Sequence, residues 1–441
     1  MLLRARLTGS SSDGPTSPFL SVSPLRRQVV EVINERCAGI DIGKDEVVAC
    51  VRMPDGSGRQ VTQTQTFRTF SSGLEAMRDW LSSCGVTTVV MEATGPYWKP
   101  VWYVLEDDPV FSLMLVNSKS VKMLPGRKTD VSDAAWLAQL LEHGLLRSSF
   151  VAPAAIRELR DLTRYRKRMI QSHTSETQRV QKVLEDAGIK LDSVASDVLG
   201  VSGRAMIAAL IAGERDPAVL AGLAKGRLRN KAPMLHEALR GRFREHHAVM
   251  LGHMMDHVVH LEGQIAALDT EIDRVMTPFA TARDRLDTIT GIGKRSAECI
   301  IAEIGIDMSQ FPTAGHLASW AGLCPGNNIS GGKRRPASPN QGNRWLCETL
   351  NQCAWAAANT RKTYLGTQFW RLAGRIGKRK AAVAVSHSII VICWHLLTND
   401  CDYQDLGPDW FTNRTDRDKR RNQLIGQLHN LGYRVTLTEA A

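Results

Sequence analysis

The 441-residue sequence predicts an α/β domain in its first third and α-helical structure in the remainder. Three observations lead to this fold class. Between residues 36 and 150, short apolar runs rich in β-branched residues alternate with helical patterns, as in α/β sheets. Apolar residues between 246 and 276 recur at spacings of four and three, which indicates a coiled-coil helix. From 281 to 400, apolar helical stretches predict a second, all-α domain.

Five strands and two helices are expected in the α/β domain. Each strand is an apolar or β-branched run bounded by Gly, Pro or polar residues. The strands are placed at 38–42, 47–53, 61–70, 87–92 and 111–117. One helix is expected just before Gly85, and another begins at Asp130 in the stretch DVSDAAWLAQLLEHGLL.

Four acidic residues of this domain are candidates for a metal site. Asp41 interrupts the apolar strand AGIDI, Glu92 ends the strand TTVVME, and Asp130 and Asp133 share one face at the start of a helix. A carboxylate in a buried strand is costly unless it is paired or binds a cation, and four converging carboxylates repel unless divalent cations neutralise them. Oxygen ligands favour Mg²⁺ or Mn²⁺, which can stabilise charge on a phosphodiester. Taken singly, Asp41 can instead cap the turn at Gly43, and Asp130 can cap its helix.

Two long helices follow, at about 154–188 and 246–276. The first carries a basic cluster that includes Arg164 and Lys167. The second has a heptad seam and is expected to pair with the first helix or with a second subunit. Its five histidines, from His246 to His260, are better explained as polar flanks of a coiled coil than as a metal site. The less regular segment between the helices holds a second basic cluster: Lys225, Arg227, Arg229, Lys231, Arg240, Arg242 and Arg244.

The helical domain contains two segments with possible chemistry. A GIG hairpin before Lys294 resembles the helix-hairpin-helix modules that hold DNA phosphates with main-chain N–H groups. The loop GNNISGGKRR fails as a phosphate-binding P-loop, because its lysine is one position late and no Ser or Thr follows it. What remains is Ser330 beside Lys333, Arg334 and Arg335. Basic neighbours suit a serine that must approach a phosphate, but the residue types alone favour an ordinary loop serine.

Composition agrees with a soluble protein that has a polyanionic partner. The chain is 43% hydrophobic and 23% charged, with a formal net charge of +11. This excess favours nucleic acid, although a merely basic protein has the same balance. No apolar run reaches the roughly 18 residues of a membrane helix, and no signal peptide is visible, so we expect no membrane partner. Nine cysteines without a CxxC pair indicate reduced thiols in the cytoplasm.

The chain is expected to divide into five segments. Residues 1–35 are rich in Ser, Gly and Pro and should form a disordered extension. Residues 36–150 form the catalytic α/β domain, and residues 151–280 the coiled-coil helices with their basic insertion. Residues 281–400 form the helical domain with the serine, and residues 401–441 a basic tail.

These motifs together resemble the DEDD transposases of bacterial insertion sequences, the IS110 group. GIDIGK, MEATGPYW and KTDVSDA are similar to the RuvC-like (RNase H-like) domain of that family, and GIGKRSA and LCPGNNISGGK to its transposase domain. The five blocks keep the family's order over about 300 residues. Carried over by position, the resemblance implies that Asp41, Glu92, Asp130 and Asp133 bind the metal and that Ser330 is the nucleophile.

The resemblance also implies an RNA-guided recombinase that excises and inserts its own insertion sequence. The serine attacks a DNA phosphodiester, assisted by Mg²⁺ (or Mn²⁺). A structured bridge RNA pairs with donor and target DNA, and dimers assemble into a tetramer in which the acids of one subunit meet the serine of another. The protein would work in the bacterial cytoplasm, on the nucleoid when bound to DNA. Candidates for nucleic-acid contact are Arg164, Lys167, Lys225, Arg227, Arg229, Lys294, Lys333, Arg334 and Arg335.

Other functions stay open at this point. A RuvC-like structure-specific nuclease would use metal and water and leave Ser330 idle. A nucleic-acid-binding protein would use the acids only structurally. A sugar-kinase or actin-like fold is disfavoured, because it needs a second phosphate-binding glycine loop, which the sequence lacks.

Overall fold

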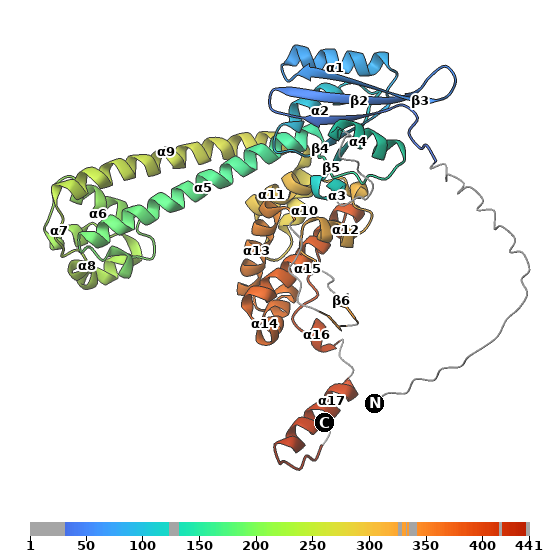
Figure 1. Ribbon diagram of the computed structural model, residues 1–441. Helices are drawn as coiled ribbons and strands as arrows, with labels where there is room; N and C mark the ends of the chain where they lie inside the picture. Colours follow the sequence, from blue (N-terminus) through green and yellow to red (C-terminus); the bar gives the residue numbers. More distant parts are fainter. Residues whose placement is uncertain are drawn as a thin grey trace, which may run out of the picture. The chain divides into compact units, whose positions relative to one another are not determined.

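The computed structural model describes residues 31–122, 132–324, 329–331, 333–334, 342–413 and 417–437 (Figure 1). Most of the predicted disordered extension therefore lies outside the described residues, as do Asp130 and Arg335. The chain divides into two compact units, the first ending at Val151 and the second beginning at Ala152.

The first unit is an α/β domain built on one five-stranded mixed sheet. The strand order is β3-β2-β1-β4-β5; β1, β2 and β3 are antiparallel, and β4 and β5 run parallel to β1. The strands are β1 (Cys37–Ile42), β2 (Glu46–Pro54), β3 (Gln60–Arg68), β4 (Thr88–Glu92) and β5 (Ser112–Val116). The helices are α1 (Ser71–Ser83), α2 (Trp98–Glu106), α3 (Ser118–Lys122) and α4 (Asp133–Glu142).

The central strand β1 is buried on both faces, so its side chains divide between two cores. Ala38, Ile40 and Ile42 pack into the cluster that includes residues of α1 and α2, while Cys37 packs into the cluster of α4. Gly39 lies on the α4 side, where an added Cβ would be 2.3 Å from the Ala134 carbonyl oxygen. The glycine thus lets the backbone of α4 approach the sheet closely, which places the start of α4 beside the end of β1.

The second unit begins with two long helices, α5 (Ala154–Asp186) and α9 (Glu245–Met276), which pack along each other (Figure 1). The heptad seam of α9 faces inward, with Val258, Leu261 and Ile272 buried. Within this chain, the partner of the seam is therefore α5.

The segment between α5 and α9 was expected to be less regular, but it folds into short helices with a core of its own. These are α6 (Val201–Ile211), α7 (Pro217–Gly222) and α8 (Ala232–Ala238), with 3₁₀ turns at Leu191–Ser193 and Gly226–Lys231. Their buried side chains join the ends of α5 and α9 in one apolar cluster. The helices were missed because two of them are too short to show a period, and α6 is apolar on most sides.

The rest of the second unit is a helical domain, as predicted. Its helices are α10 (Ala280–Asp287), α11 (Lys294–Ile304), α12 (Ala314–Trp320), α13 (Arg344–Asn359), α14 (Tyr364–Ile376), α15 (Lys378–Asn399), α16 (Trp410–Asn413) and α17 (Arg417–Asn430). The apolar helix α15 is long enough to cross a membrane, but half of its most apolar stretch is buried, as in the core helix of a globular domain. It packs against α10, α12, α13 and α14.

The predicted GIG hairpin joins α10 to α11. Gly291 has a φ of +91°, and a Cβ there would lie 2.4 Å from the Cys353 carbonyl oxygen. This glycine therefore brings the turn against the backbone of α13, which explains its presence by packing.

Candidate active site

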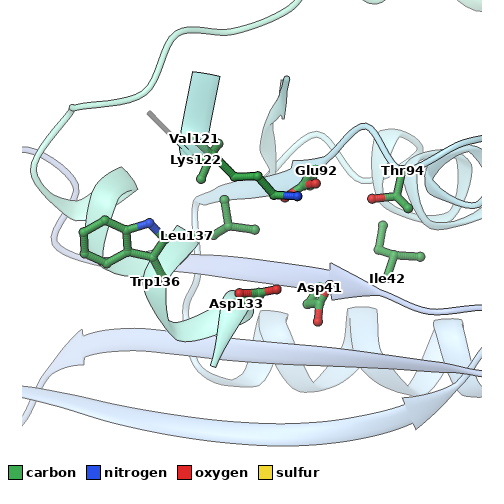
Figure 2. A pocket seen from close by; sticks show the side chains of 9 residues that line it. All are labelled: Asp41, Ile42, Glu92, Thr94, Val121, Lys122, Asp133, Trp136 and Leu137. Carbon is green, nitrogen blue, oxygen red and sulfur yellow. The ribbon is translucent and has the colours of Figure 1, made fainter. Parts of the chain in front are cut away.

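Three of the four predicted acids line one pocket of the first unit, of about 270 Å³ (Figure 2). Asp41, Glu92 and Asp133 come from β1, β4 and α4, three segments that are far apart in sequence. The remaining lining residues are Ile42, Thr94, Val121, Lys122, Trp136 and Leu137. The fourth acid, Asp130, lies outside the described residues.

The sheet and helix α4 position these carboxylates. Parallel pairing sets Ile40 of β1 opposite Met91 of β4, so Asp41 and Glu92 are the next residues at the carboxyl ends of two neighbouring strands. Both follow the alternation that points toward α4. Asp133 is the first residue of α4, and the Ser132 hydroxyl caps that helix by accepting a hydrogen bond from the Ala135 N–H at 3.3 Å. Close packing at Gly39 holds this helix end near the strand ends.

Among the described residues that line the pocket, acidic side chains outnumber basic ones. Asp41 and Glu92 are partly buried and Asp133 is exposed, so burial limits solvent screening for two of the acids. Lys122 is a cation on the pocket lining, and Figure 2 shows its side chain extended toward Glu92. Three carboxylates against one ammonium group are an oxygen-rich donor set, which suits a hard divalent cation such as Mg²⁺ or Mn²⁺.

Thr94 and Lys122 were not predicted from the sequence. Thr94 belongs to the MEATG motif, in which only Glu92 was predicted as a site residue. Lys122 follows β5 in a short helix with no local signal of its own.

The predicted nucleophile Ser330 belongs to the second unit. It ends β6 (Ile329–Ser330), which pairs with β7 (Lys333–Arg334) in a two-stranded hairpin, Ser330 opposite Lys333. Gly331 takes a φ of +57° at the turn, a conformation that favours glycine. The serine thus lies on a short hairpin whose other strand is basic.

Two predicted nucleic-acid contacts on α5 are engaged inside the protein. Arg164 donates two hydrogen bonds of 2.7 Å to the buried carboxylate of Glu303 on α11. Lys167 forms a 3.0 Å ion pair with Glu348 on α13. Both cations also lie 5.5 Å from the centre of the Trp345 ring. These contacts join α5 to the helical domain. Lys294 is likewise paired, with Asp273 at 2.7 Å.

Three other predicted contacts are exposed between α7 and α8: Lys225 precedes the 3₁₀ turn, and Arg227 and Arg229 lie on it. We call them the tip cluster. None of them forms an ion pair with another residue in the part of the chain that the structure describes. Their charge is therefore available to an external anion.

A group of Asp186, His246 and His247 lies where α5 ends and α9 begins, with potential ligand atoms within 4.8 Å of one another. His247 Nδ1 accepts a hydrogen bond of 3.1 Å from the Arg244 N–H, so the ring proton is on Nε2, which is 3.0 Å from the Asp186 carboxylate. A metal-binding histidine donates its second ring N–H instead of accepting there. This contact is thus a helix cap of α9 tied to the end of α5, in agreement with the structural interpretation of these histidines.

Comparison with known proteins identifies the family. A family model described as a transposase of the DEDD IS110 type matches residues 38–189, and the model of the transposase IS116/IS110/IS902 family matches residues 283–371. A probable family 20 transposase of Pseudomonas aeruginosa is 26% identical over 337 residues, which cover 74% of this chain and 89% of that protein.

Two shorter similarities point the same way. An uncharacterized 43.6 kDa protein of insertion element IS110 from Streptomyces coelicolor is 34% identical over 22% of this chain and 24% of its own length. The pilin gene-inverting protein of Moraxella bovis is 40% identical over 17% of this chain and 24% of its own length. The segments that the two family models match, residues 38–189 and 283–371, include parts of both units. The chain therefore belongs to the IS110 family of transposases and is a DNA transposase or recombinase.

Proposed function

We propose that this protein excises and inserts its own insertion sequence by cutting and rejoining DNA strands, with Asp41, Glu92, Asp130 and Asp133 holding Mg²⁺ or Mn²⁺. The observation that carries the proposal is the convergence of three of these acids in one pocket. In this assignment residues 36–150 are an RNase H-like catalytic domain, and residues 281–400 the transposase domain.

The acids and their neighbours would divide the work. A divalent cation in the pocket neutralises the carboxylates and stabilises charge on a phosphodiester. Asp41 and Glu92 would hold the cation at a fixed position, because they lie at the ends of two hydrogen-bonded strands. Asp133 would bind it from the start of α4. Lys122, at the same pocket, can hold a non-bridging phosphate oxygen of the DNA by charge-assisted hydrogen bonding.

Ser330 is the proposed nucleophile. Its Oγ would form a bond to phosphorus while the bond from phosphorus to a sugar oxygen breaks, leaving a covalent phosphoserine link. Support comes from its place on a glycine turn opposite a basic strand, since Lys333 and Arg334 suit a phosphate. The hydroxyl proton needs an acceptor, which a carboxylate of the acidic pocket of another subunit can supply.

The choice of DNA sites by a bridge RNA, and the assembly of dimers into a tetramer, are parts of the proposal that rest on the family resemblance. Surface cations in the tip cluster are suited to hold RNA or DNA phosphates. The enzyme would act in the bacterial cytoplasm on nucleoid DNA.

A first experiment tests the acidic pocket. Asp41→Asn should abolish Mg²⁺-dependent strand cleavage and remove the thermal stabilisation that Mn²⁺ gives the wild-type protein, because a ligand raises stability only where it binds. RNA binding should persist. Asp45→Asn, an exposed carboxylate four residues along the chain and away from the pocket lining, is the matched control. Equal Mn²⁺ stabilisation in Asp41→Asn and wild type would refute the metal assignment.

A second experiment separates the proposal from its alternative, a RuvC-like nuclease that uses metal and water. That alternative would use the acidic pocket of the first unit and leave Ser330 idle. Ser330→Ala should eliminate both the covalent protein–DNA adduct and cleavage. Cleavage that continues without an adduct would establish the nuclease instead.

A further inference from the structure

The cations just before α14, on α14 and at the start of α15 lie in a part of the sequence that has no acidic residues. The sequence contains no Asp or Glu from Thr349 to Asn399, a stretch that includes seven exposed Lys and Arg residues. They are Arg361, Lys362, Arg371, Arg375, Lys378, Arg379 and Lys380. None of them forms an ion pair with any residue that the structure describes, in contrast to Arg164 and Lys167 on α5.

A groove of about 470 Å³ lies among these cations. Arg361, Thr367, Trp370, Arg371 and Phe411 line it. It thus combines two guanidinium groups with two aromatic rings, and no acidic side chain lines it among the residues that the structure describes.

The two rings are held in place by the protein. The Trp370 indole N–H donates a 2.8 Å hydrogen bond to the Ala358 carbonyl, although 38% of the residue remains exposed. Phe411 stacks on Tyr364, with ring centroids 4.9 Å apart and an interplanar angle of 14°. Exposing a large aromatic side chain forgoes the stabilisation of burying it, so a fixed and exposed ring indicates an interaction surface.

The cations are arranged over these same rings. The Arg361 guanidinium lies 5.1 Å from the Trp370 ring centre, and the Arg371 guanidinium lies 4.2 Å from that of Phe411. Lys378 approaches Trp370 from the start of α15, at 5.5 Å. Cation–π contacts of this kind orient the positive groups at the groove without neutralising them.

We propose that this aromatic and basic groove binds an unpaired segment of nucleic acid. A base would stack at Trp370, and the flanking phosphates would pair with Arg361, Arg371 and the Lys378–Lys380 run. A duplex presents phosphates but keeps its bases inside the stack, whereas a single strand uses aromatic rings and cations together. The inference rests on the proposed function only in taking nucleic acid as the partner; it adds a site outside the acids, the serine and the tip cluster.

Photocrosslinking can locate the strand on the full-length protein. A single-stranded oligonucleotide with one 5-iodouracil would be irradiated with the wild-type protein in EDTA, so that cleavage chemistry plays no part. The expected product is an adduct on the tryptic peptide TYLGTQFWR, residues 363–371, which contains Trp370. DNA and RNA versions of the oligonucleotide distinguish a displaced DNA strand from an RNA loop. Adducts found only on other peptides would overturn the inference.

Binding measurements then separate stacking from charge. Trp370→Leu should weaken single-strand binding about tenfold, within the range known for removal of one base–aromatic stack. Trp370→Phe keeps a ring but lacks the hydrogen bond to Ala358, and should bind within about twofold of wild type. The matched control is Trp355→Leu, since Trp355 is similarly exposed on α13 but is not part of the groove lining. Equal affinity in Trp370→Leu and Trp355→Leu would refute the stacking role.

The double variant Arg361→Gln/Arg371→Gln should lower the salt dependence of single-strand binding by about 0.7 for each phosphate that the two guanidinium groups neutralise. An unchanged slope would refute the phosphate role. Weaker binding to anionic phospholipid vesicles, with oligonucleotide binding intact, would assign the surface to a membrane instead. Because these assays need no metal, they can fail while Asp41-dependent cleavage persists, and they can succeed while cleavage is absent.

Discussion

Substitution of Gly39 by alanine tests how the acidic pocket is assembled. The new Cβ would meet the Ala134 carbonyl oxygen at 2.3 Å and the Ala138 nitrogen at 2.4 Å, both backbone atoms of α4. Because backbone atoms cannot rotate aside, the helix must shift away from β1. Overpacking of this kind costs about 1–3 kcal/mol. The shift also moves Asp133, at the start of α4, relative to Asp41, so metal affinity should fall together with stability.

Urea unfolding of the full chain, with and without Mn²⁺, measures both effects. Gly39→Ala should unfold at lower urea, and its stabilisation by Mn²⁺ should shrink. Gly56→Ala is the matched control, since a Cβ there meets no atom within 4 Å and the residue is not among the glycines with positive φ. Wild-type stability and wild-type Mn²⁺ response in Gly39→Ala would show that α4 does not depend on the close approach at Gly39.

Three further outcomes follow from burial and charge. Glu298→Ala should destabilise the second unit by about 1.5–3 kcal/mol in thermal unfolding, because the buried guanidinium of Arg166 loses a charge-assisted hydrogen bond of 2.7 Å and keeps Asp269 at 2.8 Å; a destabilisation below about 0.5 kcal/mol would contradict this. Burial raises the pKa of the Cys353 thiol to about 11, so the thiol stays protonated at about pH 8. Cys353 should therefore resist iodoacetamide until the protein unfolds, while exposed Cys401 reacts at once. Mass mapping that finds Cys353 labelled in the native protein would refute the buried placement. Replacing the tip cluster by glutamine should flatten the salt dependence of nucleic-acid binding by roughly one unit per phosphate contact, and an unchanged slope would show that it faces no phosphate.

The α/β domain was predictable because its strands are runs of apolar or β-branched residues bounded by turns; β3, with the sequence QVTQTQTFR, owes its pattern to threonine and valine. The observed β1, Cys37–Ile42, begins one residue before the expected 38–42, and β4 and β5 lie within the predicted limits. The acids could be proposed because each stands at a strand or helix end, where local pattern and topology agree. Helix α4 begins in the described chain at Asp133, with Ser132 as its cap, so the alternative role of Asp130 as a helix cap has a competitor two residues later that the hydrogen bond to Ala135 supports.

The helices between α5 and α9 could not be predicted with the same method. A six-residue helix such as α7 contains fewer than two turns, so no apolar period can develop in it. It forms because its buried Leu220 completes a core that α5 and α9 supply from both sides. Tertiary packing, and not local pattern, decides such elements.

The local sequence correctly indicates exposed positive charge for one basic cluster but not for another. The α5 cluster looks like a nucleic-acid surface, yet Arg164 and Arg166 are matched by Glu303 and Glu298 on α11, more than a hundred residues away. Only the fold brings these acids close. The cluster of α14 and α15 differs, because α13, α14 and α15 pack on one another and almost all of their residues lie within the acid-free stretch. From Thr349 onward these three helices contain no carboxylates that could neutralise the cations. Their positive charge is therefore available to bind a polyanion.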